Sequence, residues 1–443
     1  MHCNPVRLLR FSAGPAGLKY RLIRNPGLYF YKHRGRCAPQ QNSAGPAGSI
    51  GIADLCVAPS RRTLRSTPSS ARLDLDDPDA PGLARKAQKS NSGFCSKFVV
   101  GCLAVIVGAR GASAEGGDLK APAPNSPEEP MAQQVSLEKA AEFLDATALG
   151  WTRQRKCGSC HTNYVYLFAR PALKGIASPA ATEVRGFFED RVTHWETAKP
   201  RWDTEVVATA VALAVNDAAT TGKLHPLSRK ALDLMWPLQK EDGSWDWLKC
   251  GWPPMEHDDY FGVVYAAIGV GAAPDGYAAT ESAKAGIAKL REHLRAHPAP
   301  SLHHKAMLLW ASSKLDGLLT PEEAQKTVEQ LRALQKPDGG WSLASLGDWK
   351  RHDGNANDAA QADAYATSFL AVVLRAAGAP ADDPALRKAR DWLRGHQRAS
   401  GRWFTRSPSA DNYHFLTHAA TAYAVMALAD ESGAAPAGSA ERR

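Results

Sequence analysis

The sequence predicts an all-α protein. Beyond residue 180, apolar side chains recur about every three to four residues in segment after segment, and the alternation typical of strands is almost absent. Pro321 and Pro384 stand where the first turn of a helix tolerates proline, and glycine marks the ends of several segments. The predicted helices cover residues 204–215, 227–238, 261–270, 282–296, 303–315, 322–334, 364–376, 385–396 and 415–429.

The first part of the chain has the composition of a leader followed by an export signal. Residues 1–94 are rich in Arg, Pro, Ser and Gly without periodicity, so we interpret them as a disordered leader or as a translation start placed too far upstream. Residues 95–114 predict a signal peptide, because a basic stretch precedes an apolar run that ends in Ala112-Ser113-Ala114. That run is too short for a membrane span, which takes about 20 apolar residues. We therefore expect a periplasmic or otherwise exported protein that begins near Glu115.

The mature chain divides further by composition. Residues 115–134 are expected to be a Pro/Ala/Glu-rich linker, and residues 135–180 a short helical segment that carries a cysteine motif. Its helix is predicted over 137–149, with Ser136 as N-cap. Residues 181–432 form the predicted repeat domain, and residues 433–443 a disordered tail.

Charge and cysteine usage exclude two classes of protein. Residues 1–114 hold 17 of the 54 Lys and Arg residues but only 5 of the 45 Asp and Glu residues, so the mature chain is weakly acidic. Such a chain lacks the basic footprint of a nucleic-acid-binding protein. After the signal, the cysteines are Cys157, Cys160 and Cys250, which excludes a scaffold built on disulfides.

Cys157 and Cys160, followed at once by His161, match the Cys-X-X-Cys-His pattern of a c-type haem. In such a site both sulfurs form thioethers with the porphyrin and the imidazole, here that of His161, binds the iron. A haem c would imply redox chemistry and an electron-transfer protein as partner. The alternatives are a local disulfide or a zinc or iron site. The candidate distal ligands are Met131, Met235, Met255, His194 and His257.

An internal repeat is the strongest architectural signal. The pattern Gln-X-X-X-Gly-X-Trp occurs at residues 239–245, 335–341 and 397–403, each time after an amphipathic helix. Glycine accepts the left-handed backbone that ends a helix, and the Gln amide and Trp ring can brace the turn against neighbouring helices.

This repeat resembles the QW repeats of squalene–hopene cyclases, oxidosqualene cyclases and their prenyltransferase-like relatives, over about residues 183–432. The resemblance implies an α/α toroid, in which inner and outer helices alternate around a central cavity that holds an apolar small molecule. The chain has helices for one toroid, whereas triterpene cyclases carry two.

The segment Glu256-His257-Asp258-Asp259 is similar to the Asp-X-Asp-Asp acid motif of squalene–hopene cyclases. By this resemblance Asp258 would protonate an alkene, flanked by Glu256 and Asp259, and would need a carboxyl group that stays neutral. The chain departs from the family by continuing with Tyr260 where family members have Thr. The alternative role for these acidic residues is to cap the helix that follows.

Two histidine pairs complete the candidates. His414 and His418 are spaced to share one face of a helix, but the sequence supplies no third ligand beside them. The adjacent pair His303-His304 also lacks a third ligand nearby in the sequence. The sequence thus predicts an exported toroid with haem c and redox or lyase-type chemistry on an apolar ligand. Two alternatives are a non-catalytic toroid that binds a ligand or partner, with the two cysteines as a disulfide, and an acid-type isoprenoid cyclase led by Asp258.

Overall fold

The computed structural model describes residues 119–408, 410–411 and 413–429. Within these residues the regular structure consists of twelve α-helices and four short 3-10 helices, which confirms the predicted all-α class. The predicted leader, signal peptide and C-terminal tail lie outside the described residues. None of the described helices is both long and apolar enough to cross a membrane.

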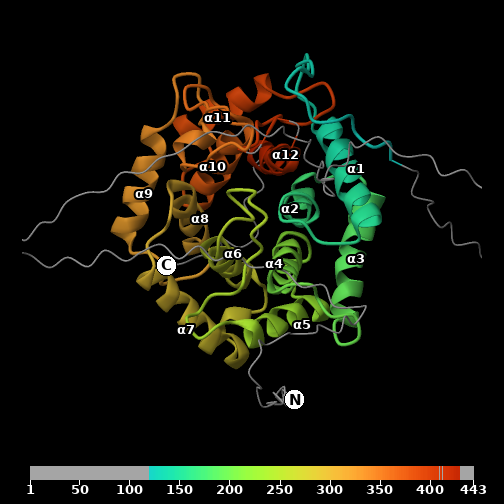
Figure 1. The fold of residues 1–443 in the computed structure, drawn as a ribbon, viewed down its shortest axis with the longest axis vertical. Coiled ribbons are helices and arrows are strands. Elements are labelled where there is room, and N and C mark those ends of the chain that lie inside the picture. The colour runs from blue at the N-terminus through green and yellow to red at the C-terminus, as the bar shows by residue number, and fades with distance from the viewer. Residues whose placement is uncertain (1–118, 409, 412, 430–443) are drawn as a thin grey trace, which may run out of the picture. The chain divides into compact units, whose positions relative to one another are not determined.

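The even-numbered helices form an inner ring. Each contacts the next in chain order, and the last contacts the first, so the ring is closed (Figure 1). These helices are α2 (Asn163–Ala169), α4 (Asp203–Thr220), α6 (Asp259–Ala272), α8 (Leu302–Ser312), α10 (Ala364–Ala376) and α12 (Phe415–Ala429).

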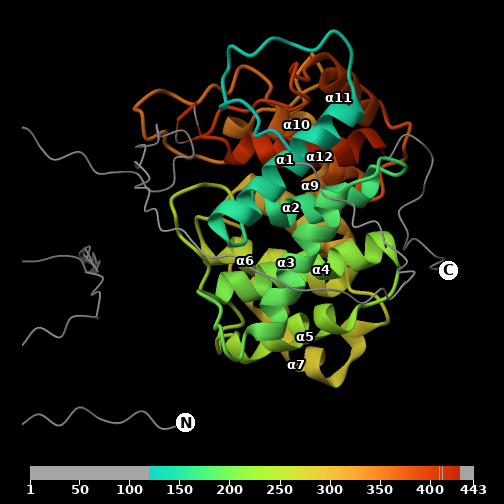
Figure 2. The same cartoon turned by 90° about the vertical axis from the view of Figure 1, so that its right-hand side faces the viewer.

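The odd-numbered helices lie outside this ring. Figure 2 shows α1 and α3 on the outer side of the described part, in front of the inner helices. The outer helices are α1 (Leu137–Arg155), α3 (Pro179–His194), α5 (Pro226–Met235), α7 (Glu281–Ala296), α9 (Pro321–Ala333) and α11 (Pro384–Gly395). Alternation of inner and outer helices around a closed ring is the arrangement of an α/α toroid.

The distribution of apolar residues explains which helices are inside. The inner helix α6 buries every residue from Tyr260 to Val270, as a helix enclosed on all sides does. The outer helix α11 buries Leu386, Ala389 and Leu393 and exposes charged residues such as Lys388. That spacing gives one apolar stripe, which faces the inner ring.

The repeat tryptophans brace the turns as predicted. Trp245, Trp341 and Trp403 have 0% exposure. Each donates its indole N–H to a backbone carbonyl ten residues earlier, over 2.7–2.8 Å; the acceptors are Met235, Leu331 and Leu393. Each ring therefore ties the turn after an outer helix to the body of that helix.

The repeat glutamines make three links between outer helices. In every copy the amide nitrogen donates to the carbonyl of the repeat glycine and to a second backbone carbonyl. The second acceptors are Gly286 of α7 at 3.0 Å, Ala385 of α11 at 2.8 Å and Ser136, the N-cap of α1, at 2.8 Å. The third copy thus joins the end of α11 to the start of α1 and closes the outer layer.

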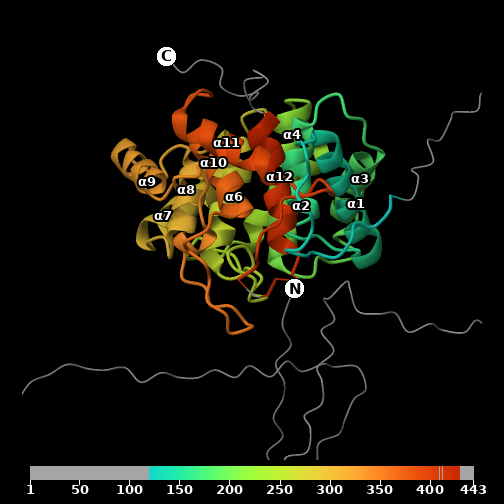
Figure 3. The ribbon, with the colours of Figure 1, turned by 90° about the horizontal axis from the view of Figure 1, so that it is seen from above.

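We call the place where α11 and α12 meet α1 and α2 the seam. Figure 3 shows α12 beside α2 there, and the two helices are in contact. Gly401 of the third repeat has φ +93°, and a Cβ on it would lie 2.3 Å from the backbone of Lys139 in α1. Only glycine permits this approach.

Two predicted boundaries need correction. The segment 135–180 is not a separate unit before the toroid, because α1 and α2 are its first outer and inner helices and contact α3, α4 and α12. The predicted helix over 137–149 also continues to Arg155, with Ser136 as N-cap as expected.

The described part of the linker, residues 119–134, packs against the third repeat and against Tyr413, which follows it. Glu129 pairs with Arg402, the Ala399 N–H donates to the Pro130 carbonyl at 2.8 Å, and the Asn125 side chain donates to the Tyr413 carbonyl at 3.1 Å. Composition predicted a Pro/Ala/Glu-rich linker here. Polar contacts at the seam hold its described part in place.

Candidate functional site

The Cys-X-X-Cys-His motif forms a tight loop at the seam. Helix α1 ends at Arg155, and the left-handed backbone of its C-cap, Lys156, turns the chain toward the inner ring. The buried side chain of Asn163 fastens the loop, because it accepts from the Ser159 N–H at 2.8 Å and donates to the Cys157 carbonyl at 3.0 Å. Gly158 has no room for a side chain, since a Cβ would lie 2.0 Å from the hydroxyl oxygen of Tyr164.

This loop brings His161 to His414 and His418. One ring nitrogen of each histidine lies within 4.8 Å of the other two, a spacing that can hold a metal ion. The hydroxyl oxygen of Thr162 lies 2.8 Å from Nδ1 of His161 and 3.0 Å from Nδ1 of His418. The sequence offered His161 as a metal ligand and lacked a third ligand for His414 and His418; the fold brings these two observations together.

Burial keeps two of these imidazoles neutral. It lowers the pKa of His161 well below the ordinary value, and nearby His414 adds to the effect. It lowers the pKa of His418 in the same way, with His414 again the next cause. Neutral imidazole is the form of histidine that binds metal ions.

The acidic segment contributes one residue to the seam. Glu256 is buried beside Cys160, and the Trp252 ring, held by a backbone bridge to Glu256, packs 5.5 Å from the His161 ring. Burial, followed by the Glu256 carboxylate, raises the pKa of the Cys160 thiol well above its ordinary value. Burial also raises the pKa of Cys157. Both groups are therefore thiols at neutral pH, and a thiol is a poor nucleophile.

Asp258 and Asp259 point elsewhere. Asp258 is the N-cap of α6, where its carboxylate accepts from the Phe261 N–H at 3.0 Å and lies 3.1 Å from Nε2 of His304. Burial alone would raise the pKa of Asp258, but His304 and the Phe261 N–H outweigh it and lower the pKa below the ordinary value. Asp259 accepts from the Trp247 N–H at 2.9 Å and pairs with Lys249.

This geometry favours the capping role over the acid role. An alkene-protonating acid has to carry its proton at neutral pH, whereas Asp258 is held as a carboxylate. The three acidic residues also have different partners: Glu256 lies beside Cys160, Asp258 contacts His304 and Asp259 pairs with Lys249. They therefore do not form one acidic cluster.

The space around His161 tests whether the motif fits a haem. A porphyrin on this imidazole would need an open face beside the ring. His161 is 1% exposed, and the rings of Trp151, Trp252, His414 and Phe415 enclose it at centroid distances of 5.3–5.8 Å. The described arrangement does not accommodate a haem there. Haem attachment stays a prediction of the motif, and the five candidate distal ligands are not members of the histidine cluster.

The interior of the inner ring is lined with aromatic side chains. Phe168 of α2 stacks on Tyr265 of α6 at 5.8 Å and meets Trp310 of α8 at 6.1 Å, and Trp310 meets Tyr423 of α12 at 6.1 Å. The buried hydroxyl of Tyr265 has no hydrogen-bond partner among the described residues. Nδ1 of His303 is also buried without one, while its Nε2 lies 2.9 Å from the Tyr365 hydroxyl.

The comparisons with known proteins bear on the fold. No family model matches the chain, and no curated protein matches it. Among solved structures, it is similar to ent-copalyl diphosphate synthase from Streptomyces platensis, with 15% identity and a TM-score of 0.40, over 60% of this chain and 50% of that one. The chain thus spans half the length of that structure, and the likeness carries no argument about activity. The closed ring of helices establishes the fold class by itself.

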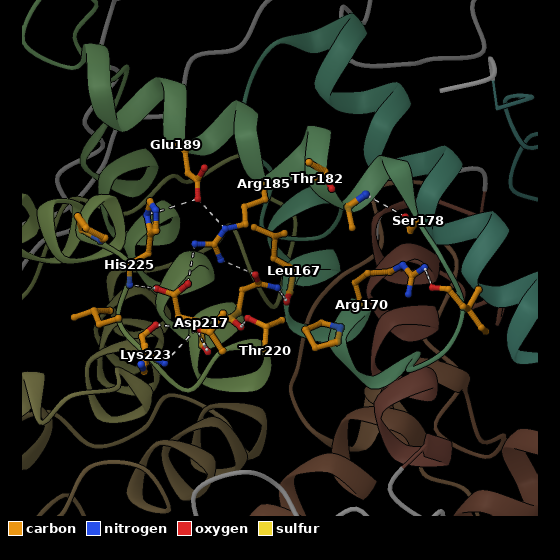
Figure 4. A pocket seen from close by; sticks show the side chains of 17 residues that line it. Leu167, Arg170, Ser178, Thr182, Arg185, Glu189, Asp217, Thr220, Lys223 and His225 are labelled. Carbon is orange, nitrogen blue, oxygen red and sulfur yellow. Dashed lines mark hydrogen bonds and ion pairs between the residues drawn. The ribbon is translucent and has the colours of Figure 1, made fainter. Parts of the chain in front are cut away.

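A cavity of about 860 Å³ between the outer helix α3 and the inner helices α2 and α4 holds none of the predicted site residues (Figure 4). Arg185 crosses it from α3 and contacts Glu189 at 2.8 Å, Asn216 at 2.7 Å and Asp217 at 2.7 Å. Asp217 also accepts from the His225 N–H at 2.8 Å. These polar groups bind one another and hold α3 against α4 and the start of α5. We therefore assign the cavity a structural role.

Proposed function

We propose that this protein is an exported toroid that binds an apolar ligand against the aromatic interior of its inner ring. The observation that carries the proposal is the Tyr265 hydroxyl, which is buried among stacked rings without a partner. An unsatisfied buried hydroxyl costs about 1–3 kcal/mol, so a ligand that brings one polar group into this apolar setting gains a hydrogen bond that the free protein lacks.

We propose binding and not catalysis, because the side chains that would carry the chemistry have unsuitable protonation states. Asp258 is a carboxylate where an acid is required. Cys160 is a thiol where a nucleophile would be a thiolate. This supports the ligand-binding alternative over the acid-type cyclase.

The test compares two fluorescent-competition titrations of the purified full chain, one with farnesol and one with the matching hydrocarbon farnesene. Tyr265→Phe removes only the hydroxyl and should weaken farnesol binding about five-fold while leaving farnesene binding unchanged. Tyr277→Phe is the control, since the Tyr277 hydroxyl already contacts Asp233 at 2.8 Å near the outer helices. Equal affinities of wild type and Tyr265→Phe for farnesol would remove the basis of the proposal.

Covalent haem at Cys157 and Cys160, with redox chemistry and an electron-transfer partner, is the second candidate, and it requires the rings that enclose His161 to move apart. It is favoured by two thiols and an imidazole placed together in one loop of a chain with a predicted export signal. Coexpression with cytochrome c maturation proteins tests it: a porphyrin that survives denaturation and is lost in Cys157→Ala/Cys160→Ala would support it. Its absence from matured protein would contradict it.

Export has its own measurement. The intact mass of the protein from its native host should correspond to a chain that starts at or near Glu115. A chain that retains residues before position 98 would contradict the export prediction.

A further inference from the structure

The geometry points to a transition-metal site made by His161, His414 and His418, in which the ion fastens the first inner helix to the last across the seam. This inference stands apart from ligand binding in the ring interior, because it uses different residues and a different end of the inner helices.

The donor set fits a small ion. The three ring nitrogens already lie within 4.8 Å of one another, and tetrahedral metal–nitrogen bonds of about 2.0–2.1 Å place such nitrogens about 3.3 Å apart, so each pair has to approach by at most about 1.5 Å. Three imidazoles favour zinc, copper or nickel over magnesium or calcium, which prefer oxygen ligands. The set leaves a fourth coordination position for water or another donor.

The surroundings orient the rings. Thr162 can accept from the Nδ1–H groups of both His161 and His418, and in that state their Nε2 lone pairs are available to a metal. Trp151 packs edge-on to His161 at 5.3 Å, and Phe143 packs edge-on to His418 at 5.5 Å. These contacts limit the rotation of the two imidazoles before any ion arrives.

The position of the cluster gives the ion a mechanical role. His161 lies just before α2, whereas His418 lies on α12, and Thr162 and His418 are 256 residues apart in sequence. A metal ion bound by both His161 and His418 would cross-link the start of the first inner helix to the last inner helix. Because the unfolded chain does not present these ligands together, the binding free energy adds to the stability of the closed ring.

The test uses the full chain stripped with EDTA and then titrated with Zn²⁺ or Co²⁺. We expect one ion per chain by elemental analysis, d–d absorption bands with Co²⁺, and a melting temperature about 5 °C higher with excess Zn²⁺. His414→Gln and His418→Gln should each weaken binding by at least about 100-fold, since each removes one of three ligands.

The matched control is the His293→Gln/His297→Gln variant of α7. These two histidines are also four residues apart, with ring centroids separated by 4.2 Å, but they lie outside the cluster. This variant should bind the ion like wild type. If His418→Gln fails to fold, the half-buried His414 provides the second variant.

Three results would overturn the inference. The first is stripped wild-type protein that takes up no Zn²⁺ or Co²⁺ at a 100-fold molar excess of ion over protein. The second is equal loss of binding in the cluster variants and the control. The third is purified protein with a covalent haem bound through His161, which would place that imidazole on porphyrin iron.

Discussion

The seam can be weakened at a single side chain, Gln397. Its amide nitrogen donates to the Ser136 carbonyl at 2.8 Å and the Gly401 carbonyl at 2.9 Å, and its oxygen accepts from the Ser136 N–H at 2.7 Å. Gln397→Ala removes all three contacts. At about 1 kcal/mol for each, we expect the free energy of unfolding to fall by about 3 kcal/mol.

Gln335 provides the matched comparison within the same repeat pattern. Its two contacts of this kind go to Gly339 and Ala385, both at 2.8 Å and both between neighbouring turns and helices rather than across the seam. Gln335→Ala should therefore cost about 2 kcal/mol. Urea unfolding followed by circular dichroism measures both variants, with the midpoint compared if the transition is not two-state. A Gln397→Ala variant within 0.5 kcal/mol of wild type, or one less destabilised than Gln335→Ala, would refute the reasoning.

Three further predictions concern other sites. Gly401→Ala should lower the free energy of unfolding by about 2–4 kcal/mol. Gly378 has a similar φ of +96°, but a Cβ on it would meet nothing within 4 Å, so Gly378→Ala should lower it by about 1 kcal/mol. Equal melting temperatures of the two variants would contradict the close approach of Gly401 to Lys139. Burial raises the pKa of Asp363 to about 6, so the folded chain holds this proton more tightly than the unfolded chain. The contribution of Asp363 to stability should be fully present below about pH 4 and be lost as the pH rises through 6, by at most about 2 kcal/mol because the side chain keeps some exposure. The difference in unfolding free energy between wild type and Asp363→Asn should show this pH dependence. NMR titration should find Asp258 ionised at pH 6, with His304→Gln raising its pKa; a wild-type Asp258 still protonated at pH 6 would restore the acid role.

The helices and the repeat could be predicted because their signals are local. The three repeats carry Gln, Gly and Trp at fixed spacing, and the contacts of each copy lie mostly within one turn and its helix. The predicted helices from residue 204 onward all occur, with ends shifted by a few residues. Helix α2 escaped prediction because its seven residues are too few to show a period. Helix α3 was also not predicted, although its start carries a usable signal: Ser178 is its N-cap and Pro179 is its first residue.

The site could be predicted only in pieces, because its parts are distant in sequence. His161 and the pair His414 and His418 were each visible as candidate ligands, but only closure of the ring brings them together. Glu256 was grouped with Asp258 by sequence position, whereas the backbone bridge at Trp252 turns it toward Cys160. The loop around Cys157 matched a haem motif by residue type, and the packing around His161 is a property that residue type does not encode.

Hydrogen–deuterium exchange of the full chain with and without saturating farnesol tests the proposed interior site most directly. If the ligand lies against Phe168, Tyr265 and Tyr423, exchange should slow in peptides from α2, α6 and α12. The outer helices α3 and α5, which border the Arg185 cavity, should exchange as before. Saturating binding with protection confined to α3 and α5, or no binding of farnesol at all, would contradict the account.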